Sequence, residues 1–209
     1  EILESFAKAS NLSIPEYEKL YYQRKIANSE LDAYFVHDRS VRESGHDTSY
    51  RLECICAFLN AVELNAMLYK YETDFAEIIS FYFNNNYEYN NTNYTHQYWL
   101  DKAITRKKLM NQYLWNDKEN CYFDYNIETK TQNIFLSATS FFPLWAKIAT
   151  QEQADKMIEN SLPKLVSLGG IAGCSKDALS NIEKHQMQRQ WDYPNGWPPH
   201  QIIIWQGLI

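Results

Sequence analysis

The sequence predicts an all-α fold, in which long helices are joined by substantial loops. Glycine and proline each occur six times in 209 residues, which is too few for a protein made of many tight hairpins. Hydrophobic residues make up 45% of the chain and aromatic residues 15%, which indicates a packed core and excludes a disordered protein. We therefore expect a single domain over residues 1–209, arranged as an array of paired helices.

Two long helices are expected at 50–71 and 95–115, because apolar residues recur there every three to four positions. The spacing of Ser13 with Glu16, and of Thr150 with Gln153, is typical of capping boxes at helix starts. Shorter helices are expected at 2–9, 73–83, 138–149, 154–168 and 200–205. Strand content is expected to be low, with one short strand at 121–125 and a polar loop at 84–93.

The charge balance argues against polyanionic partners. Lys and Arg number 20 and Asp and Glu 26, and this net charge of −6 opposes nucleic acids and anionic lipids. The sequence contains no apolar run of the 18 to 20 residues that a membrane span needs, and it has no basic start typical of a signal peptide. We expect a cytoplasmic protein, and we interpret the glycosylation sequons at Asn11, Asn90 and Asn93 as chance occurrences.

No cofactor or metal site is predicted from the motifs present. There is no phosphate-binding glycine loop, His-x-x-x-His pair or EF-hand loop. The histidines at 46, 96 and 200 stand alone in the sequence and are expected to be structural or on the surface. The four cysteines show no disulfide or zinc spacing, so we expect reduced and mostly buried thiols.

The segment 41–51, Val-Arg-Glu-Ser-Gly-His-Asp-Thr-Ser-Tyr-Arg, is polar and lacks an amphipathic period. It could be a loop in which Asp47, Thr48 or Ser49 caps the following helix. It could also be a binding site, in which Gly45 allows the backbone to approach a ligand and Arg42 donates hydrogen bonds to hydroxyl groups. Asp47 would then be an acid with a raised pKa. The two interpretations are compatible with each other.

The segment 190–201, Gln-Trp-Asp-Tyr-Pro-Asn-Gly-Trp-Pro-Pro-His-Gln, places two tryptophans among amide and carboxylate groups. Aromatic faces stack on the C–H faces of sugar rings, while amides and carboxylates bind the hydroxyl groups. A structural turn with core tryptophans explains this composition less well. We therefore favour a surface that binds an uncharged polyol.

Both segments resemble sequences of the trehalases, family 37 of the glycoside hydrolases, in the form found in fungal neutral trehalases. Residues 42–51 are similar to the segment around that family's catalytic acid, and residues 190–199 are similar to its signature Gln-Trp-Asp-x-Pro-x-Gly-Trp-x-Pro. Shorter similar stretches lie at 68–72, 123–126 and 168–170. The resemblance therefore covers essentially the whole chain.

The resemblance implies part of an (α/α)6 barrel, incomplete at both ends, that hydrolyses α,α-trehalose to two glucose molecules with inversion. Asp47 corresponds to the general acid, Arg42 and Gly45 to positions that contact the substrate, and Trp197 to a tryptophan that lines the sugar pocket. Four other residues are carried over only as members of the pocket-forming motif: Gln190, Trp191, Asp192 and Asn195.

Inversion requires two carboxyl groups about 6.5 to 9.5 Å apart, and Asp47 supplies only one of them. The family's base is a Glu in a Glu-Lys-Tyr segment downstream of the second signature, and no such segment occurs in residues 1–209. Glu43 and Asp192 lack the matching context. Because the chain also begins with Glu1 and ends on the apolar Ile209, we expect a piece of a longer trehalase that is inactive by itself.

Two rival functions remain open at this stage. The chain could be a trehalose-binding or interaction module without catalysis, or an (α/α)6 enzyme acting on other glucosides. The resemblance also implies that calcium and 14-3-3 proteins would act through an N-terminal region that these residues do not contain. An incomplete barrel is expected to leave apolar helix faces exposed to water.

Overall fold

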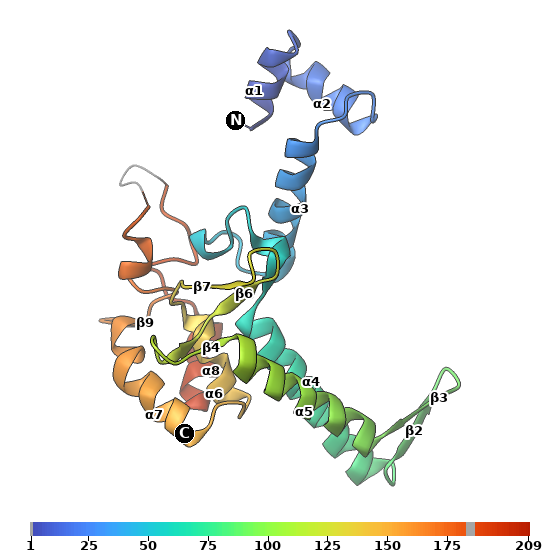
Figure 1. Cartoon of the computed structure of the whole chain (residues 1–209), viewed down its shortest axis with the longest axis vertical. Helices are drawn as coiled ribbons and strands as arrows, with labels where there is room; N and C mark the ends of the chain where they lie inside the picture. The colour runs from blue at the N-terminus through green and yellow to red at the C-terminus, as the bar shows by residue number, and fades with distance from the viewer. Residues whose placement is uncertain (1, 183–186) are drawn as a thin grey trace.

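The computed structural model describes residues 2–182 and 187–209, and its first part is a group of three helices (Figure 1). The helices are α1 (Ile2–Ala9), α2 (Ile14–Tyr22) and α3 (Ser29–Ser44). Their small core contains Ala7, Tyr17 and Leu31. The Asn28 side chain caps α3 by accepting a hydrogen bond from the backbone N–H of Leu31 at 3.0 Å. Figure 1 shows α3 leading from this group to the rest of the molecule.

Two long antiparallel helices, α4 (Val62–Tyr82) and α5 (His96–Tyr113), pack along their length. The helix expected at 95–115 is confirmed as α5, with Thr95 as its cap. At their far end in Figure 1, the hairpin of β2 (Asn86–Tyr89) and β3 (Thr92–Thr95) joins them. Several large apolar residues of the pair are exposed: Tyr71, Phe75, Ile78, Ile104 and Leu109.

The hairpin corrects the expectation of a polar loop at 84–93. Its two central residues, Asn90 and Asn91, have positive φ angles of 47° and 57°. Positive φ at both positions is the requirement of the tight type I′ turn, which matches the twist of the flanking strands. Asparagine adopts this conformation more readily than most residues, so the polar composition forms a turn between two strands.

The expectation of separate helices at 50–71 and 73–83 is wrong, because α4 begins at Val62 and runs unbroken to Tyr82. Residues before it form 3-10 turns at Tyr50–Leu52 and Cys56–Phe58, followed by the strand β1 (Leu59–Asn60). Cys54 has a φ of 56° between the two turns, which interrupts any α-helix there. Residues 50–61 thus have the apolar spacing of a helix but do not form an α-helix.

The C-terminal part contains shorter helices than expected. The region 138–149 forms a 3-10 helix, Ala138–Phe141, and the single turn α6 (Phe142–Trp145). The region 154–168 contains the end of α7 (Gln151–Asn160), then a 3-10 turn with Pro163 in it, which cannot extend the α-helical hydrogen bonding. The Thr150 capping box is confirmed, since Gln153 N donates to Thr150 Oγ1 at 3.2 Å and Thr150 N donates to Gln153 Oε1 at 2.9 Å. The helix expected at 200–205 is confirmed as α8 (Pro198–Gly207).

Short strands complete the fold, so the chain is mainly but not wholly helical. In the described part of the chain, the antiparallel order β1-β6-β7 forms one small sheet, and three two-stranded pairs accompany it. The remaining strands are β4 (Trp115–Asn116), β5 (Cys121–Tyr122), β6 (Asp124–Asn126), β7 (Thr131–Asn133), β8 (Val166–Ser167) and β9 (Gly170–Ile171). The strand expected at 121–125 is thus found as β5 and β6.

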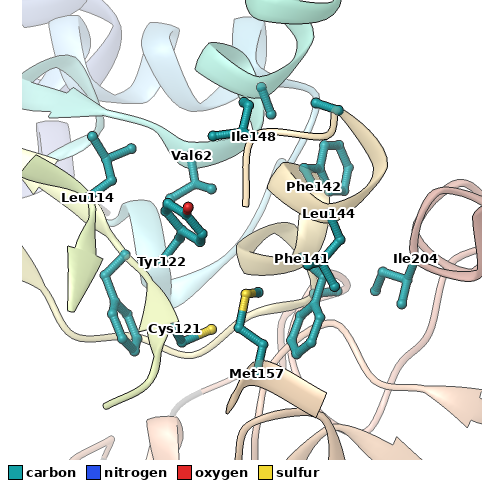
Figure 2. Packing of buried hydrophobic residues seen from close by; sticks show 14 of the residues in the cluster. Val62, Leu114, Cys121, Tyr122, Phe141, Phe142, Leu144, Ile148, Met157 and Ile204 are labelled. Carbon is teal, nitrogen blue, oxygen red and sulfur yellow. The ribbon is translucent and has the colours of Figure 1, made fainter. Parts of the chain in front are cut away.

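The main core lies where α4, α6, α7, α8 and β5 converge (Figure 2). Tyr122, Phe141 and Met157 are fully buried at its centre, and Ile204 packs in from α8. This packing fixes the start of α4 and the start of α8 relative to each other, and both starts adjoin the candidate site.

All four cysteines are free thiols, as expected, but only Cys121 and Cys174 are buried. Cys56 is half-buried and Cys54 is exposed, so the expectation of mostly buried thiols holds for two of the four. Within residues 2–182 and 187–209, no helix is both long and apolar enough to cross a bilayer.

Candidate functional site

The two polar segments singled out in the sequence lie against each other, although about 140 residues separate them. We call residues 45–49 the Asp47 loop and residues 190–197 the Trp segment. The Gln190 side chain donates a hydrogen bond to the Asp47 carbonyl, and Trp191 N donates to the Thr48 carbonyl at 3.3 Å. These contacts align the segments residue by residue and form one continuous site.

The buried side chain of Asp192, in the Trp segment, connects this segment to the Asp47 loop. Its carboxylate accepts hydrogen bonds from Ser49 Oγ at 2.7 Å and from Tyr50 N at 2.8 Å, and the residue is 1% exposed. Burial raises the pKa of the Asp192 carboxyl, and the two hydrogen bonds oppose that change. With both oxygens engaged, Asp192 holds the Asp47 loop in place from inside the protein.

The Asp47 loop begins at a glycine that ends α3. Residues 41–44, which the sequence placed in a polar segment, are the last turn of that helix. Gly45 has a φ of 78° and donates its N–H to the Arg42 carbonyl at 3.3 Å. A Cβ atom at Gly45 would meet no atom within 4 Å, so the glycine is required by the backbone conformation and not by lack of space.

Replacing Gly45 by Ala is expected to lower the free energy of unfolding by about 1–2 kcal/mol, because a left-handed conformation strains any residue with a Cβ. Urea unfolding of the 209-residue chain measures this. Gly169→Ala is the matched control, since Gly169 has open space and no positive φ, so its effect should be much smaller. Equal losses in the two variants would contradict the explanation.

Ser49, one of the three candidate caps, performs that role. Its Oγ accepts a hydrogen bond from Arg51 N at 3.1 Å at the start of the 3-10 turn Tyr50–Leu52. Asp47 itself is half-buried, and among residues 2–182 and 187–209 no group donates a hydrogen bond to its carboxylate. Next to the loop lies a hollow of about 240 Å³, whose lining includes Thr48 and Arg189.

Arg42 is exposed on the last turn of α3 and forms a two-point ion pair on its own helix. Its Nε and Nη2 atoms donate to Asp38 Oδ2 and Oδ1 at 3.0 and 3.1 Å. The sequence left open whether Arg42 faces Asp47 or a ligand. In this structure its guanidinium is directed at Asp38.

The tryptophans of the Trp segment form a stacked pair. The rings of Trp191 and Trp197 lie 4.5 Å apart at an interplanar angle of 18°. Trp197 Nε1 donates to the Gln190 carbonyl at 2.7 Å, and Asn195 Nδ2 donates to the Arg189 carbonyl at 3.0 Å. These bonds hold the segment in its turned shape, with the pair half-buried beside the Asp47 loop.

A buried ionic cluster behind the loop was not predicted. Arg51 Nε lies 2.9 Å from Asp124 Oδ2, and the same guanidinium bonds to Glu63 and Thr139. Burial raises the pKa of Asp124 to about 6. Burial also acts to raise the pKa of Glu63, but the Arg51 guanidinium and His46 together oppose it and the pKa is lowered. Asp124 Oδ1 also accepts from Val62 N at 2.9 Å, which fixes the start of α4. The sequence held one indication of this cluster: Asp124 is a charged residue inside the apolar run 121–125, and a buried charge needs a partner.

Two histidines expected to stand alone meet next to this cluster. His46 Nε2 lies 3.1 Å from His200 Nε2, and His46 Nδ1 lies 3.7 Å from Glu63 Oε1. Burial lowers the pKa of His46, and it lowers that of His200 to about 3, so both rings are neutral at neutral pH. The sequence held no local pattern that could place them together.

The two carboxylates weighed as a possible base are engaged elsewhere. Glu43 is exposed and pairs with Arg39 at 2.8 Å on the surface of α3. Asp192 is buried under the Asp47 loop. Within the described ranges, no cluster of three or more His, Cys, Asp or Glu residues is arranged to hold a metal ion.

Comparison with known proteins gives a consistent result along the chain. The family model described as Trehalase matches residues 2–209. The cytosolic neutral trehalase of Kluyveromyces lactis is 44% identical over 209 residues, which is 100% of this chain and 28% of the relative. The cytosolic neutral trehalase of Saccharomyces cerevisiae is also 44% identical, over 99% of this chain and 28% of the relative. The chain thus spans little more than a quarter of the length of these proteins.

The solved structures agree with these relatives. The neutral trehalase of Saccharomyces cerevisiae superimposes with a TM-score of 0.95 at 44% identity, over 99% of this chain and 38% of that one. A mannosylglycerate hydrolase of glycoside hydrolase family 63 from Thermus thermophilus gives a TM-score of 0.53 at 17% identity, over 72% of this chain and 33% of that one. This second likeness concerns the fold alone. On the family match and the high identity, the chain belongs to the trehalase family.

Proposed function

We propose that these residues form part of the active site of a cytosolic trehalase that hydrolyses α,α-trehalose to two glucose molecules with inversion. The observation that carries the proposal is the alignment of the Asp47 loop with the Trp segment. It joins the loop that carries Asp47, whose carboxylate accepts no hydrogen bond from the described residues, to the segment that carries the stacked tryptophan rings. Glycoside hydrolysis needs an acid to protonate the leaving oxygen, and an aromatic surface offers an apolar face on which a sugar ring can pack. The location in the cytosol rests on the names of the relatives.

In the proposed reaction, Asp47 protonates the oxygen between the two glucose units as the glycosidic bond breaks. A second carboxylate removes a proton from a water molecule that attacks the anomeric carbon from the opposite face. Glu43 and Asp192 are both engaged in other contacts, which argues against either as that base. We therefore place the base in a part of the trehalase fold that residues 1–209 do not represent.

The remaining candidate residues take supporting roles in this proposal. Trp197 lines the sugar pocket. When substrate binds, the Arg42 guanidinium would release the Asp38 carboxylate and donate hydrogen bonds to sugar hydroxyls instead. Gly45 and Asp192 set the path of the Asp47 loop. The other pocket-forming residues are Gln190, Trp191 and Asn195. We also propose that α4 and α5 are one helical hairpin of an (α/α)6 barrel, and that residues 1–209 belong to a single catalytic domain.

The test is a chimera in which this chain replaces the aligned segment of the Saccharomyces cerevisiae cytosolic neutral trehalase. We expect the chimera to release glucose from trehalose at a rate within about tenfold of that enzyme, because the two chains superimpose with a TM-score of 0.95 at 44% identity. The 209-residue chain alone should show no turnover. Proton NMR of the first products should show α- and β-glucose in equal amounts, since inversion changes one of the two anomeric centres.

Four outcomes would contradict the proposal or one of its parts. A chimera with the melting temperature of the parent enzyme but no trehalose hydrolysis would exclude the assigned activity. Trehalose binding by that chimera without turnover would favour a binding module. Only α-glucose among the first products would exclude inversion, and turnover by the 209-residue chain alone would show that the base lies within it.

A further inference from the structure

His46 lies at the junction of four separate parts of the structure. Its Nδ1 atom faces Glu63 in the first turn of α4, and its Nε2 atom contacts His200 in the first turn of α8. Its ring meets Trp191 edge to face, with 4.8 Å between the centroids. The residue itself directly precedes Asp47. One side chain thus connects the proposed acid to α4, α8 and the Trp segment.

The contacts favour one placement of the protons on the two imidazoles. A hydrogen bond between two Nε2 atoms requires that one carry a proton and the other accept it. If His46 carried its proton on Nε2, the lone pair on its Nδ1 would face the Glu63 carboxylate, which is repulsive. If His46 carries its proton on Nδ1, the N–H lies near the carboxylate, with 3.7 Å from Nδ1 to Glu63 Oε1, and Nε2 accepts from His200. His46 is therefore the Nδ1–H tautomer and His200 the Nε2–H tautomer.

Burial makes this arrangement persistent. The side chains of Glu63 and His46 are 4% and 13% exposed, and His200 is 3% exposed as a residue. Glu63 is held in turn by the buried Arg51 guanidinium. Among the described residues, His46 Nδ1, Glu63 Oε2 and His200 Nδ1 are buried without a hydrogen-bond partner. The set is therefore joined by the His46–His200 hydrogen bond and by the attraction between the His46 ring and the Glu63 carboxylate, which is strengthened in a medium of low dielectric constant.

We propose that His46 and His200 are positioning residues for Asp47, acting as a chain Glu63–His46–His200 that fixes the direction in which the Asp47 loop leaves α3. This inference rests on the function proposed above. Neither imidazole needs to touch the substrate. The chain acts by holding the Asp47 carboxyl group within the small displacement that proton transfer to the glycosidic oxygen tolerates.

The first test is spectroscopic and does not depend on trehalase activity. Nitrogen-15 NMR of the histidine side chains in the 209-residue chain reports which ring nitrogen carries the proton. We expect His46 to be protonated on Nδ1 and His200 on Nε2 at pH 7. His96, which does not belong to the Glu63–His46–His200 set, serves as an internal reference. Protonation of both histidines on Nε2, or a cationic His46 at pH 7, would overturn the assignment.

The second test uses donor-keeping and donor-lacking variants in the chimera described above. The variant His46→Asn keeps an N–H near the Nδ1 position, whereas His46→Leu, with a side chain of similar size, has no donor there. Gln at position 200 keeps a donor near the Nε2 site, and Leu does not. We expect kcat to fall by about 10- to 100-fold in His46→Leu and His200→Leu, with KM changed by less than about threefold. His46→Asn keeps the donor toward Glu63 and His200→Gln keeps the donor toward His46, so each should recover part of the kcat that the Leu variant loses.

Measurements on folded protein separate positioning from stability. If His46 and His200 only support the fold, kcat per folded molecule stays unchanged in all four variants while the melting temperature falls, and the proposal is overturned. Equal losses in the Asn and Leu variants also overturn it. His96→Asn, at the far end of α5, is the control and should leave kcat unchanged. Failure of the parent chimera to hydrolyse trehalose would instead contradict the proposed function, and the tautomer measurement would remain valid.

Discussion

Replacing Asp47 by Asn in the chimera is expected to lower kcat for trehalose hydrolysis by about 10²- to 10⁴-fold, with little change in KM. Asn keeps the size of the side chain but cannot donate a proton to the leaving oxygen, and general acid catalysis contributes a factor of this size. The folding of the loop should be unaffected, because the described residues donate no hydrogen bond to the Asp47 carboxylate. Initial rates of glucose release over a range of trehalose concentrations measure both constants.

Glu43→Gln is the matched control for this variant. Glu43 lies four residues away, is exposed and contacts only Arg39 in the hydrogen bonds and ion pairs of the described residues. Its replacement should leave kcat within about twofold of the parent, since exposed ion pairs contribute little. If Asp47→Asn retained full activity, or Glu43→Gln lost as much, the assignment of the acid to Asp47 would be wrong.

Replacing Arg51 by Ala should destabilise the chain by about 3–5 kcal/mol. The substitution leaves the carboxylates of Glu63 and Asp124 buried without their cation, which costs far more than the loss of an exposed pair. Because whole domains are stable by only about 5–15 kcal/mol, the midpoint of urea unfolding should fall steeply. Arg39→Ala removes an exposed ion pair of α3 and should shift the free energy of unfolding by less than about 0.5 kcal/mol. A loss below 1 kcal/mol for Arg51→Ala would contradict the role given to the cluster.

Local sequence rules predicted those elements whose structure depends on local interactions. The helix α5 follows from its apolar spacing and the Thr95 cap, and α7 begins where the Thr150 capping box indicates. The prediction of a helix over 50–61 was wrong because the apolar spacing of this region continues that of α4. Its conformation depends instead on the positive φ of Cys54 and on the burial of Arg51 by distant residues.

The candidate site was likewise predictable only in part from the sequence. The composition of the Asp47 loop and the Trp segment marked both as unusual, and the resemblance to trehalases linked them to one reaction. The register between them depends on hydrogen bonds of Gln190, Trp191 and Asp192 across about 140 residues, which no local period encodes. The meeting of His46, Glu63 and His200 likewise depends on the packing of α4 against the elements around α8, so only the structure could reveal it.

A crystal structure of the Asp47→Asn chimera with trehalose would test the central claim most directly. The claim is that the Asp47 loop and the Trp segment together surround the bond that is cleaved. We expect the side chain at position 47 within hydrogen-bonding distance, about 2.6–3.2 Å, of the oxygen joining the two glucose units, with Trp197 lining the same pocket. Trehalose bound away from position 47, or Trp197 on a surface that no sugar contacts, would contradict the claim.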